Sequence, residues 1–292
     1  MVSLRGRNAI VTGAAVGLGN AYARALAAQG VNLVLCDLRE DVDDLATELA
    51  RNGGRVVALR GDVGKPNDVR RIVDAAIAAL GSIDLLINNA GTWAGSVADD
   101  DLDKSIADYE KLVGTNLKGV YLFGRALIPH MLEHGHGGDI VNISTDHVNT
   151  CGTPFHVCPG NDRCPWKDAP RPTSGGTIMD LYDAAKWGMH GLTFAWCKAL
   201  APKGIRVNAI CMGATDSHML RGFHGFDPSP DEVATWMRAE DSAQVVIDLL
   251  EEGPGGRNGE HINLCVGRRP RLEPELPHVY ILEEDARVSA RG

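Results

Sequence analysis

A glycine-rich turn between two short apolar runs constrains the fold more than any other stretch of the chain. Residues 9–11 (Ala-Ile-Val) predict a buried strand, and residues 12–19 (TGAAVGLG) predict a tight turn that opens a helix. A second apolar run, residues 31–36, follows the helix and ends at Asp37. Strand, turn, helix and strand form one βαβ unit, whose crossover is expected to be right-handed.

The glycines of this turn suit the close approach of a phosphate. Glycine lets the backbone turn sharply off a strand, lets the main chain approach a pyrophosphate, and lets the helix pack closely on the sheet. The helix N-terminus adds unpaired N–H groups, and Asp37 lies 18 residues after Gly19, near the spacing for a carboxylate that binds a ribose. The alternative is a turn that binds no ligand. The expected contacts are Gly13, Gly17, Leu18, Gly19 and Asp37.

The glycine spacing in residues 13–19, Gly-x-x-x-Gly-x-Gly, departs from the general dinucleotide fingerprint. It resembles the short-chain dehydrogenase/reductase family, in the branch with compact subunits. Three later motifs carry the same resemblance: Asn-Asn-Ala-Gly at 88–91, Asn-Ile-Ser-Thr at 142–145 and Tyr-x-x-x-Lys at 182–186. One such motif occurs often by chance, whereas the ordered set indicates an enzyme of this family.

The alternation of apolar runs and helical patterns predicts an α/β fold. The resemblance implies a Rossmann-type, doubly wound parallel sheet of seven strands, in the order 3-2-1-4-5-6-7, within a single domain. This domain is expected to cover residues 1–267, with an irregular insertion at about 146–178. Residues 268–292, with prolines and charges of both signs, are expected to form a C-terminal tail.

Composition limits the partners and the location. A formal net charge of −9 argues against a nucleic acid or an anionic membrane as partner. No apolar run is long enough to span a bilayer and the first residues form no apolar leader, so we expect a cytoplasmic protein. Seven cysteines cannot all pair within one chain, and four of them lie in apolar runs, which is typical of reduced core residues.

Further cofactor contacts follow from the resemblance. Asp62 and Val63, after the third strand, match a pair that meets the adenine, although Asp62 also reads as a plain acid in the loop before a helix. Thr215 and Ser217 match positions that meet the nicotinamide amide and the pyrophosphate. Small residues at the end of the fourth strand leave room for a ligand. The contacts expected there are Asn89, Ala90 and Gly91.

Tyr182 and Lys186 are four residues apart, so on a helix they share one face. A free tyrosine has a pKa of about 10, too high for a base at neutral pH. A nearby ammonium favours the phenolate and lowers the pKa of the phenol. We therefore expect Tyr182 to take the hydroxyl proton of the substrate, and Lys186 to lower the pKa of Tyr182 and hold the ribose of the cofactor.

A hydroxyl and an amide complete the catalytic residues that the resemblance implies. Family members have a serine that binds the substrate oxygen where this chain has Thr145. Threonine donates and accepts in the same way, but its methyl group crowds the site, so Ser144 stays an alternative. Asn116 lies within an apolar helical pattern. The resemblance implies that Asn116 distorts the helix and holds a water, and the alternative is an ordinary hydrogen-bonded buried amide.

The stretch at about 146–178 is longer than in the family, and its prolines and glycines predict an irregular excursion. Its place beside the catalytic strand indicates a lid or wall of the active site. Its cysteines and a histidine offer four metal ligands, but no C-x-x-C pair is present and we expect no metal. A local disulfide is an alternative outside a reducing compartment. The candidate substrate contacts are His147, Phe155, His156 and Trp166, and the cysteines are Cys151, Cys158 and Cys164.

Apolar residues cover nearly every face of the helix that follows Tyr182. This pattern implies burial beyond one subunit, so we expect a helix-to-helix contact in a homo-oligomer, a dimer or a tetramer. The alternative is a helix wholly buried in one large domain. Residues 218–236 are expected to form a mobile flap over the substrate, with Met219, Phe223 and Phe226 lining the pocket.

The sequence therefore predicts an NAD-dependent oxidoreductase that interconverts a secondary alcohol and its ketone by hydride transfer. NAD is favoured because Asp37 would repel a 2′-phosphate and Val16 offers no cation, although Arg39 could turn toward a phosphate. Two alternatives stay open: a dinucleotide-binding protein with little or no turnover, and an NADP-dependent carbonyl reductase of the same fold. The insertion and the flap have no regular pattern, so the residues do not name the alcohol.

Overall fold

The strands come from short apolar runs, each followed by a turn and, in most cases, a helix. In the computed structural model they form one seven-stranded sheet with every neighbouring pair parallel, in the order β3-β2-β1-β4-β5-β6-β7. This confirms the predicted fold class and strand order. The structure describes residues 1–51, 53–148, 179–264, 266 and 269–272.

The central strands are buried along their whole length. Every residue of β1, β4 and β6 is buried, as expected of parallel strands covered on both faces. The strands are β1 (Asn8–Thr12), β2 (Asn32–Asp37), β3 (Val56–Arg60), β4 (Leu85–Asn88), β5 (Gly138–Thr145), β6 (Ile205–Met212) and β7 (His261–Leu264).

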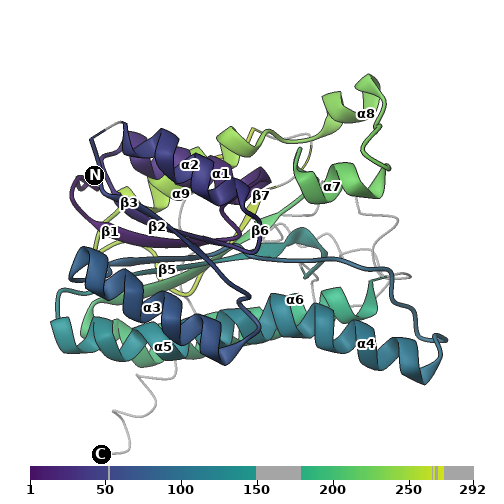
Figure 1. Cartoon of the computed structure of the whole chain (residues 1–292), viewed down its shortest axis with the longest axis horizontal. Coiled ribbons are helices and arrows are strands. Elements are labelled where there is room, and N and C mark those ends of the chain that lie inside the picture. The colour runs from purple at the N-terminus through teal and green to yellow at the C-terminus, as the bar shows by residue number, and fades with distance from the viewer. Residues whose placement is uncertain (52, 149–178, 265, 267–268, 273–292) are drawn as a thin grey trace, which may run out of the picture.

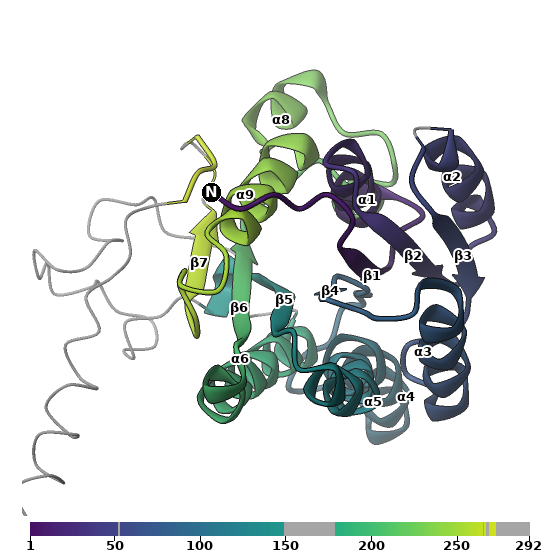
Figure 2. The same ribbon diagram turned by 90° about the vertical axis from the view of Figure 1, so that its left-hand side faces the viewer.

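Helices cover both faces of the sheet and bury two separate apolar clusters against it (Figures 1 and 2). One face carries α1 (Gly17–Ala28), α2 (Asp41–Ala50) and α9 (Ala239–Glu251). The other face carries α3 (Pro66–Leu80), α5 (Gly119–His134) and α6 (Asp180–Leu200), with α4 (Leu102–Val113) packed beside α6. The buried residues of α2 and α3 recur at helical spacing, so each helix turns one apolar face to the sheet.

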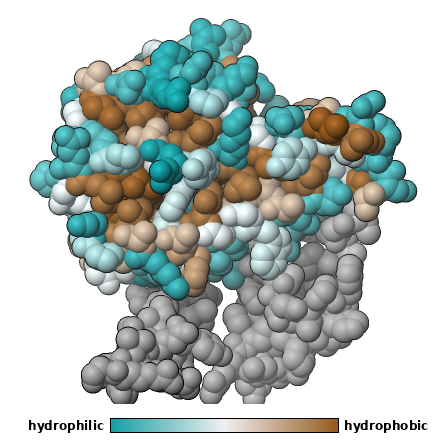
Figure 3. Space-filling view, turned by 90° about the horizontal axis from the view of Figure 1, so that it is seen from below, coloured by the Kyte–Doolittle hydropathy of each residue, from teal (hydrophilic) through white to brown (hydrophobic). Residues whose placement is uncertain are grey.

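The face formed by α4, α5 and α6 keeps large apolar side chains at the surface. Figure 3 shows this side, where apolar residues gather between polar ones. Trp187 and Phe194 of α6 are 48% and 52% exposed, and Tyr109 of α4 is 52% exposed. Trp187 and Phe194 are seven residues apart, so they point the same way from the helix. One subunit therefore leaves an apolar stripe of α6 uncovered.

Two segments differ from a plain reading of their sequence pattern. The apolar spacing around Asn116 predicts one helix, and the π-helix at Gly114–Lys118 that separates α4 from α5 is the distortion at Asn116 that the resemblance implies. Residues 218–236, expected to be a mobile connection, contain α7 (His218–Phe223) and α8 (Pro230–Thr235). Serine caps start both short helices, and Pro230 stands where the first turn needs no N–H donor.

The insertion expected at 146–178 begins with a 3₁₀ turn, Asp146–Val148. The rest of it lies outside the described residues, as do the predictions made for its cysteines and for Phe155, His156 and Trp166, and as does most of the predicted tail. Within the described part of the chain, none of the helices combines the length and the apolar character that crossing a bilayer requires.

Candidate active site

Most of the predicted site residues come from the carboxyl ends of the strands, the segments that follow them and the first two turns of α1 and α6, whereas Asn116 comes from the π-helix. In a parallel sheet these ends share one edge, where ligands bind. That edge lies on the right in Figure 1, where α7 and α8 follow β6. All of the predicted catalytic and cofactor-binding residues lie in the described part of the chain.

The turn after β1 requires glycine. Gly13 and Gly17 have φ angles of +64° and +59°, in the left-handed region that glycine adopts without strain. A Cβ on Gly19 would overlap the carbonyl oxygen of Gly13, because α1 starts against the end of the strand. The amide of Asn89 fixes the turn by donating to the carbonyl oxygens of Thr12 and Gly13, each at 3.0 Å.

The start of α1 fits a pyrophosphate. Val16 is the N-cap residue, and its side chain makes no capping hydrogen bond. The N–H groups of the first turn, which includes Leu18, therefore point toward the sheet edge without a side-chain acceptor at the cap. With positive φ at Gly17 beside them, these residues fit the phosphates of a dinucleotide.

Asp37 ends β2 beside the glycine turn. Its carboxylate accepts hydrogen bonds from the main-chain N–H groups of Ala15 and Arg39, each at 2.9 Å. The guanidinium of Arg39 turns away and donates to Asp41 at 2.9 Å. Asp37 thus lies where the resemblance implies a carboxylate that binds the ribose, and the nearby guanidinium of Arg39 is already paired with Asp41.

Asp62 and Val63 follow β3. The Asp62 carboxylate accepts from the N–H of Gly64 at 2.9 Å, which is the local loop contact that the alternative interpretation describes. Val63 is buried against Gly119 at the start of α5, where a Cβ would lie 2.7 Å from a Val63 methyl. The adenine contact of this pair stays a prediction.

The segment after β6 lies against the glycine turn. A Cβ on Gly17 would lie 3.4 Å from the Cβ of Ser217, so these two parts of the predicted cofactor site are neighbours. Ser217 caps α7 by accepting from Leu220 N–H at 3.2 Å. Thr215 is buried and its hydroxyl donates to the Gly213 carbonyl at 2.9 Å, so this hydroxyl is bonded within its own segment.

The hydroxyl of Thr12 locks β1 to the end of β4, a role that the sequence analysis missed. It accepts from the N–H groups of Asn89 and Ala90, each at 3.0 Å, and donates to the Ile87 carbonyl at 3.3 Å. Threonine directly before the first glycine is the only sequence signal for this contact. The neighbouring Asn88 amide ties β4 to β5.

Asn116 lies within the π-helix and is fully buried. Its side chain pairs with the main chain of Thr92, accepting from N–H at 3.0 Å and donating to the carbonyl at 2.8 Å. Its oxygen lies 3.0 Å from the place of a Cβ on Gly91. The helix is therefore distorted at the residue that the resemblance singled out, and the amide fixes the loop after β4.

Tyr182 and Lys186 occupy the first two turns of α6. The Lys186 ammonium lies 5.7 Å from the centre of the Tyr182 ring and donates to the Ile143 carbonyl at 2.7 Å. Lys186 is buried, and burial lowers its pKa to about 8. Lys186 lies beside Tyr182, as the four-residue spacing predicts, and its ammonium is also bonded to the end of β5.

The predicted effect on Tyr182 needs a correction. Burial raises the pKa of the Tyr182 phenol above its ordinary value, and the carboxylates of Asp183 and Asp146 act in the same direction. The sequence analysis counted the charge of Lys186 alone. Removal of water and two neighbouring anions outweigh it, because both disfavour the phenolate.

Ser144 and Thr145 have different surroundings. Ser144 is buried and lies 2.8 Å from Nε2 of His190, whose pKa burial lowers to about 3. The Thr145 hydroxyl lies 3.4 Å from the carboxylate of Asp146 and 3.4 Å from the main-chain nitrogen of His147. Ser144 is thus engaged in the interior, and Thr145 is the hydroxyl with weak, replaceable hydrogen bonds.

Two aromatic side chains lie beside the loop after β4. Trp93, two residues after the Asn-Asn-Ala-Gly motif, packs edge-on against Phe223 of α7, with ring centres 3.9 Å apart. Met219 also reaches this region, 3.8 Å from the place of a Cβ on Gly91. Phe226, predicted to line the pocket, is 59% exposed and packs on His218 instead. The sequence analysis missed Trp93, although its place after the motif was a signal.

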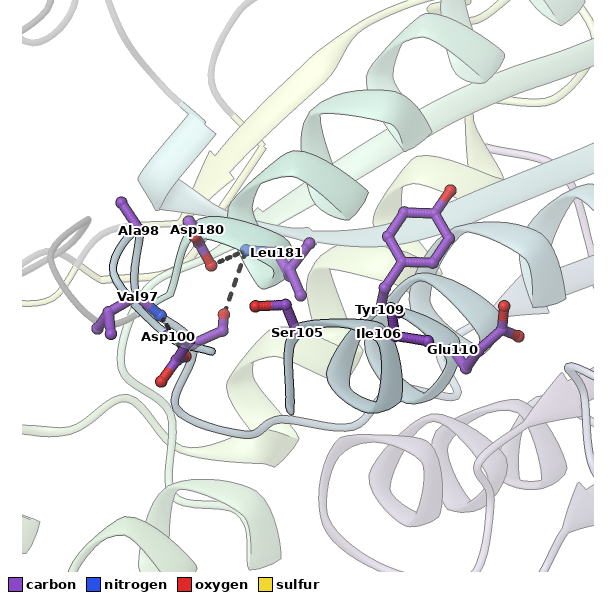
Figure 4. Close-up of a pocket in the computed structure, with 10 residues that line it drawn as sticks. Val97, Ala98, Asp100, Ser105, Ile106, Tyr109, Glu110, Asp180 and Leu181 are labelled. Atoms are coloured by element: carbon purple, nitrogen blue, oxygen red, sulfur yellow. Dashed lines mark hydrogen bonds between the residues drawn. The ribbon is translucent and has the colours of Figure 1, made fainter. Parts of the chain in front are cut away.

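A cavity of about 460 Å³ opens beside the start of α6. Figure 4 shows Leu181 of α6 pointing toward Ser105 and Tyr109 of α4, with Asp100 and Asp180 at one side. Leu181 precedes Tyr182, but successive helical residues point about 100° apart. The residues that line the cavity come from α4, the loop before it and the start of α6, so the cavity lies between these helices rather than at the glycine turn.

Residues 7–152 match the family model described as short chain dehydrogenase, and residues 173–267 match the one described as Enoyl-(Acyl carrier protein) reductase. The chain is 32% identical over 265 residues to cis-4-hydroxycyclohexanecarboxylate dehydrogenase of Sinomonas cyclohexanicum, covering 86% of this chain and 96% of that protein. The chain belongs to the short-chain dehydrogenase/reductase family. This short-chain dehydrogenase/reductase is an NAD(P)-dependent enzyme that acts on CH–OH groups.

Other relatives agree with this family. The short-chain dehydrogenase/reductase is 32% identical to 3beta-hydroxysteroid dehydrogenase 1 of Eggerthella lenta, over 73% of this chain and 72% of that protein. A short chain dehydrogenase of Burkholderia cenocepacia, solved in complex with NADP, is similar in structure with a TM-score of 0.71. It is 26% identical, over 90% of this chain and 98% of that chain.

Proposed function

We propose that the enzyme is an NAD-dependent dehydrogenase that interconverts a cyclic secondary alcohol and its ketone. The observation that carries this proposal is the placement of Tyr182 and Lys186 on one face of α6, joined to β5 by the Lys186–Ile143 hydrogen bond of 2.7 Å. The glycine turn and Asp37 lie at the same edge of the sheet.

The cofactor would be held by groups already in place. The α1 N-terminus would bind the pyrophosphate with Ser217, and Asp37 would bind the ribose of the adenosine half. The remaining predicted contacts are Gly13, Gly17, Leu18, Gly19, Asp62, Val63, Asn89, Ala90, Gly91, Lys186 and Thr215. The chemistry that bound NAD supplies is hydride transfer with the carbinol carbon.

The chain's own residues would move the proton. Thr145 donates a hydrogen bond to the substrate oxygen, exchanging its 3.4 Å contact with Asp146 for a shorter one. Tyr182 takes the hydroxyl proton during oxidation and returns it during reduction. Lys186, in its protonated form, opposes the effect of burial on the phenol. Asn116 keeps the distorted helix and the Thr92 loop in place, and we keep the proposal that it anchors a water for proton release.

NAD is supported over NADP by charge. The Asp37 carboxylate is fixed by two main-chain N–H groups, so it cannot turn away from a 2′-phosphate without losing both. Arg39, the cation that could have accepted that phosphate, is paired with Asp41. The NADP found with the Burkholderia cenocepacia relative belongs to that protein. Titrations with NADH and NADPH test the choice directly.

A cyclic, largely apolar substrate is supported by Trp93, Phe223 and Met219 beside the loop after β4. Two relatives are named for cyclic alcohols, a hydroxycyclohexanecarboxylate and a hydroxysteroid. Aromatic walls bury flat, apolar rings well. A screen of cyclic and steroidal secondary alcohols against open-chain ones tests this class.

The decisive experiment is Tyr182→Phe. It removes one hydroxyl from the phenol and leaves the ring that packs beside Lys186. We expect kcat to fall by about 10²- to 10⁴-fold, with NADH affinity kept within about threefold. NADH binding by the wild type with no turnover of any alcohol in the screen would support the alternative, a dinucleotide-binding protein with little activity.

A homo-oligomer is supported by the exposed stripe on α6 and α4 that Figure 3 includes. Exposed aromatic residues at one helical face favour association with a second copy. A cytoplasmic location is supported by buried thiols: burial raises the pKa of Cys36 to about 12, and Cys197 is also a buried thiol. Cell fractionation with an antibody to the protein tests the location.

A further inference from the structure

Two residues that the proposed chemistry does not use lie close in the sequence to residues that it does use. His147 follows Thr145 by two positions, and Asp183 follows Tyr182 directly. In the sequence Thr145 and Tyr182 are separated by an insertion longer than the family's. In the structure His147 Nδ1 and Asp183 Oδ1 are 3.1 Å apart.

Resting on the proposed function, we propose that the His147–Asp183 pair is a clamp that sets the position of Thr145 against Tyr182. One end of the clamp is rooted in the turn that follows β5, and the other in the first turn of α6. Both residues are positioning residues, because they act through the hydroxyl and the phenol rather than on the substrate.

The contacts of His147 lead to both groups. Its main-chain N–H lies 3.4 Å from the Thr145 hydroxyl, and its ring lies edge-on to the Tyr182 ring with centres 6.3 Å apart. The side chains of His147 and Asp183 are only 23% and 21% exposed, so water competes weakly for their hydrogen bond. A shift of this pair would move the hydroxyl and the phenol relative to each other.

The His147–Asp183 bond adds a contact from a distant segment to the first turn of α6, where Asp180 accepts locally from the Leu181 N–H at 2.7 Å. The N-cap residue of this helix, Met179, makes no side-chain capping hydrogen bond. The links from Ser96 to this turn are long, at 3.4 Å to the Asp180 nitrogen and 3.3 Å to the Leu181 nitrogen. Because catalysis loses rate steeply when reacting groups are misplaced, a polar contact one residue from the phenol has a direct effect on turnover.

The charges around His147 give the clamp a pH dependence. Asp183 faces it from α6, Asp146 faces it from its own turn, and the neutral Tyr182 phenol packs beside it. The hydrogen bond to Asp183 raises the pKa of His147, against the effect of burial. The charged part of the contact is therefore complete below the ordinary histidine pKa of about 6.5, and is lost as pH rises through the raised value.

A double-mutant cycle tests the clamp, with His147→Ala, Asp183→Ala and the double variant. We expect each single variant to lower kcat by roughly tenfold. The double variant should lower kcat no further than the less active of the two single variants does, because either substitution already breaks the contact. The dissociation constant of NADH should stay within about threefold in all three. The advantage of wild type over Asp183→Ala in kcat should shrink as pH rises through the raised pKa of His147.

Asp180→Ala is the matched control, because it also removes a carboxylate from the first turn of α6 but one that is exposed and bonds its neighbour Leu181. Equal kcat for Asp180→Ala and Asp183→Ala, or losses that multiply in the double variant, would overturn the clamp. A lower melting temperature without a fall in kcat would also overturn the clamp, because the pair would then have only a structural role.

A measurement without turnover separates this proposal from the proposed function. Histidine-ring NMR should give His147 a pKa above 6.5 in the wild type and a lower one in Asp183→Ala. An unshifted His147 signal in the variant would show that the pair does not form in solution. Full activity in Tyr182→Phe would instead overturn the proposed function, whatever the NMR result.

Discussion

The ammonium of Lys186 lies 5.7 Å from the centre of the Tyr182 ring, one helical turn along α6. Both groups are removed from water, with opposite results: burial lowers the pKa of the lysine to about 8 and raises that of the phenol. Each group is pushed toward its neutral form. A charged lysine and a phenolate would therefore stabilise each other at this site.

Lys186 should make stability depend on pH in a definite direction. Its pKa in the folded protein, about 8, is below the ordinary 10.5, so keeping it charged opposes folding below pH 8. That cost disappears as pH rises from about 8 to 10.5. We expect the stability of wild type relative to Lys186→Met to rise over this range, by on the order of 3 kcal/mol.

Denaturant unfolding at several pH values measures this difference, and Lys203→Met, at an exposed position, controls for the loss of one charge. A wild-type advantage that stays flat or falls with pH would contradict the assignment of a lowered pKa to Lys186.

Thr145 and Ser144 should separate activity from stability. Thr145→Val removes the hydroxyl proposed to bind the substrate oxygen, and we expect kcat to fall about 10²-fold with stability nearly unchanged. Ser144→Ala leaves the buried His190 without its 2.8 Å partner, and we expect a loss of about 1–3 kcal/mol of stability with kcat within threefold. Thr145→Ser should retain turnover. Steady-state kinetics and chemical denaturation give the answer, and the reverse pattern would assign the substrate contact to Ser144.

Asp37 should control the choice of dinucleotide. Asp37→Asn removes the charge but keeps an oxygen for the Ala15 N–H, so the glycine turn should survive. We expect the ratio of NADPH to NADH affinity to rise about tenfold or more, because repulsion of the 2′-phosphate is removed. Fluorescence titration of both nucleotides measures the ratio. Asp44→Asn, an exposed carboxylate of α2, is the control, and an equal ratio in both variants would refute the role of Asp37.

Gly19 should tolerate no side chain. An alanine Cβ there would overlap the Gly13 carbonyl, which is main chain and cannot rotate away. We expect Gly19→Ala to weaken NADH binding at least about tenfold and to lower the melting temperature. Gly255→Ala adds the same methyl group where no atom lies within 4 Å. Calorimetry of both variants tests the contrast, and similar behaviour would mean that the turn adapts.

Phe194 should report the oligomeric state. It is half exposed in one subunit, so Phe194→Asp should change the stability of an isolated subunit by less than about 0.5 kcal/mol. If a second copy covers this face, a buried carboxylate should dissociate the assembly. Light scattering after size exclusion measures the mass. Phe226→Asp, at another exposed aromatic residue, should leave the mass unchanged. An assembly that survives Phe194→Asp would place its interface elsewhere.

The sequence predicts the sheet well because each strand is a short apolar run with a turn signal at its end. The order of the strands came from the family resemblance, and the structure confirms it. The apolar spacing alone does not predict the π-helix, because Leu112, Leu117 and Val120 continue the helical pattern through it; the distortion at Asn116 was expected from the resemblance. The distortion depends on Asn116 reaching the main chain of Thr92, a contact between distant segments.

The electrostatics of the site were harder to predict than its residues. The four-residue spacing places Lys186 beside Tyr182, but the direction of the phenol's pKa depends on burial, which sequence spacing does not give. Trp93 was missed because its partner, Phe223, lies on a helix 130 positions later. His147 was expected to contact substrate, and its contact with Asp183 depends on how the two ends of the insertion meet.

The contact between Gly17 and Ser217 joins two segments of the enzyme that are far apart in the sequence. The first of these residues belongs to the opening βαβ unit and the second to the segment after β6, so 200 positions of chain separate two neighbouring parts of the proposed cofactor site. A truncated polypeptide ending near residue 152 would keep the glycine turn but lose the segment that packs against it. Attempts to transplant the nucleotide-binding half into another scaffold would have to carry α7 along with it.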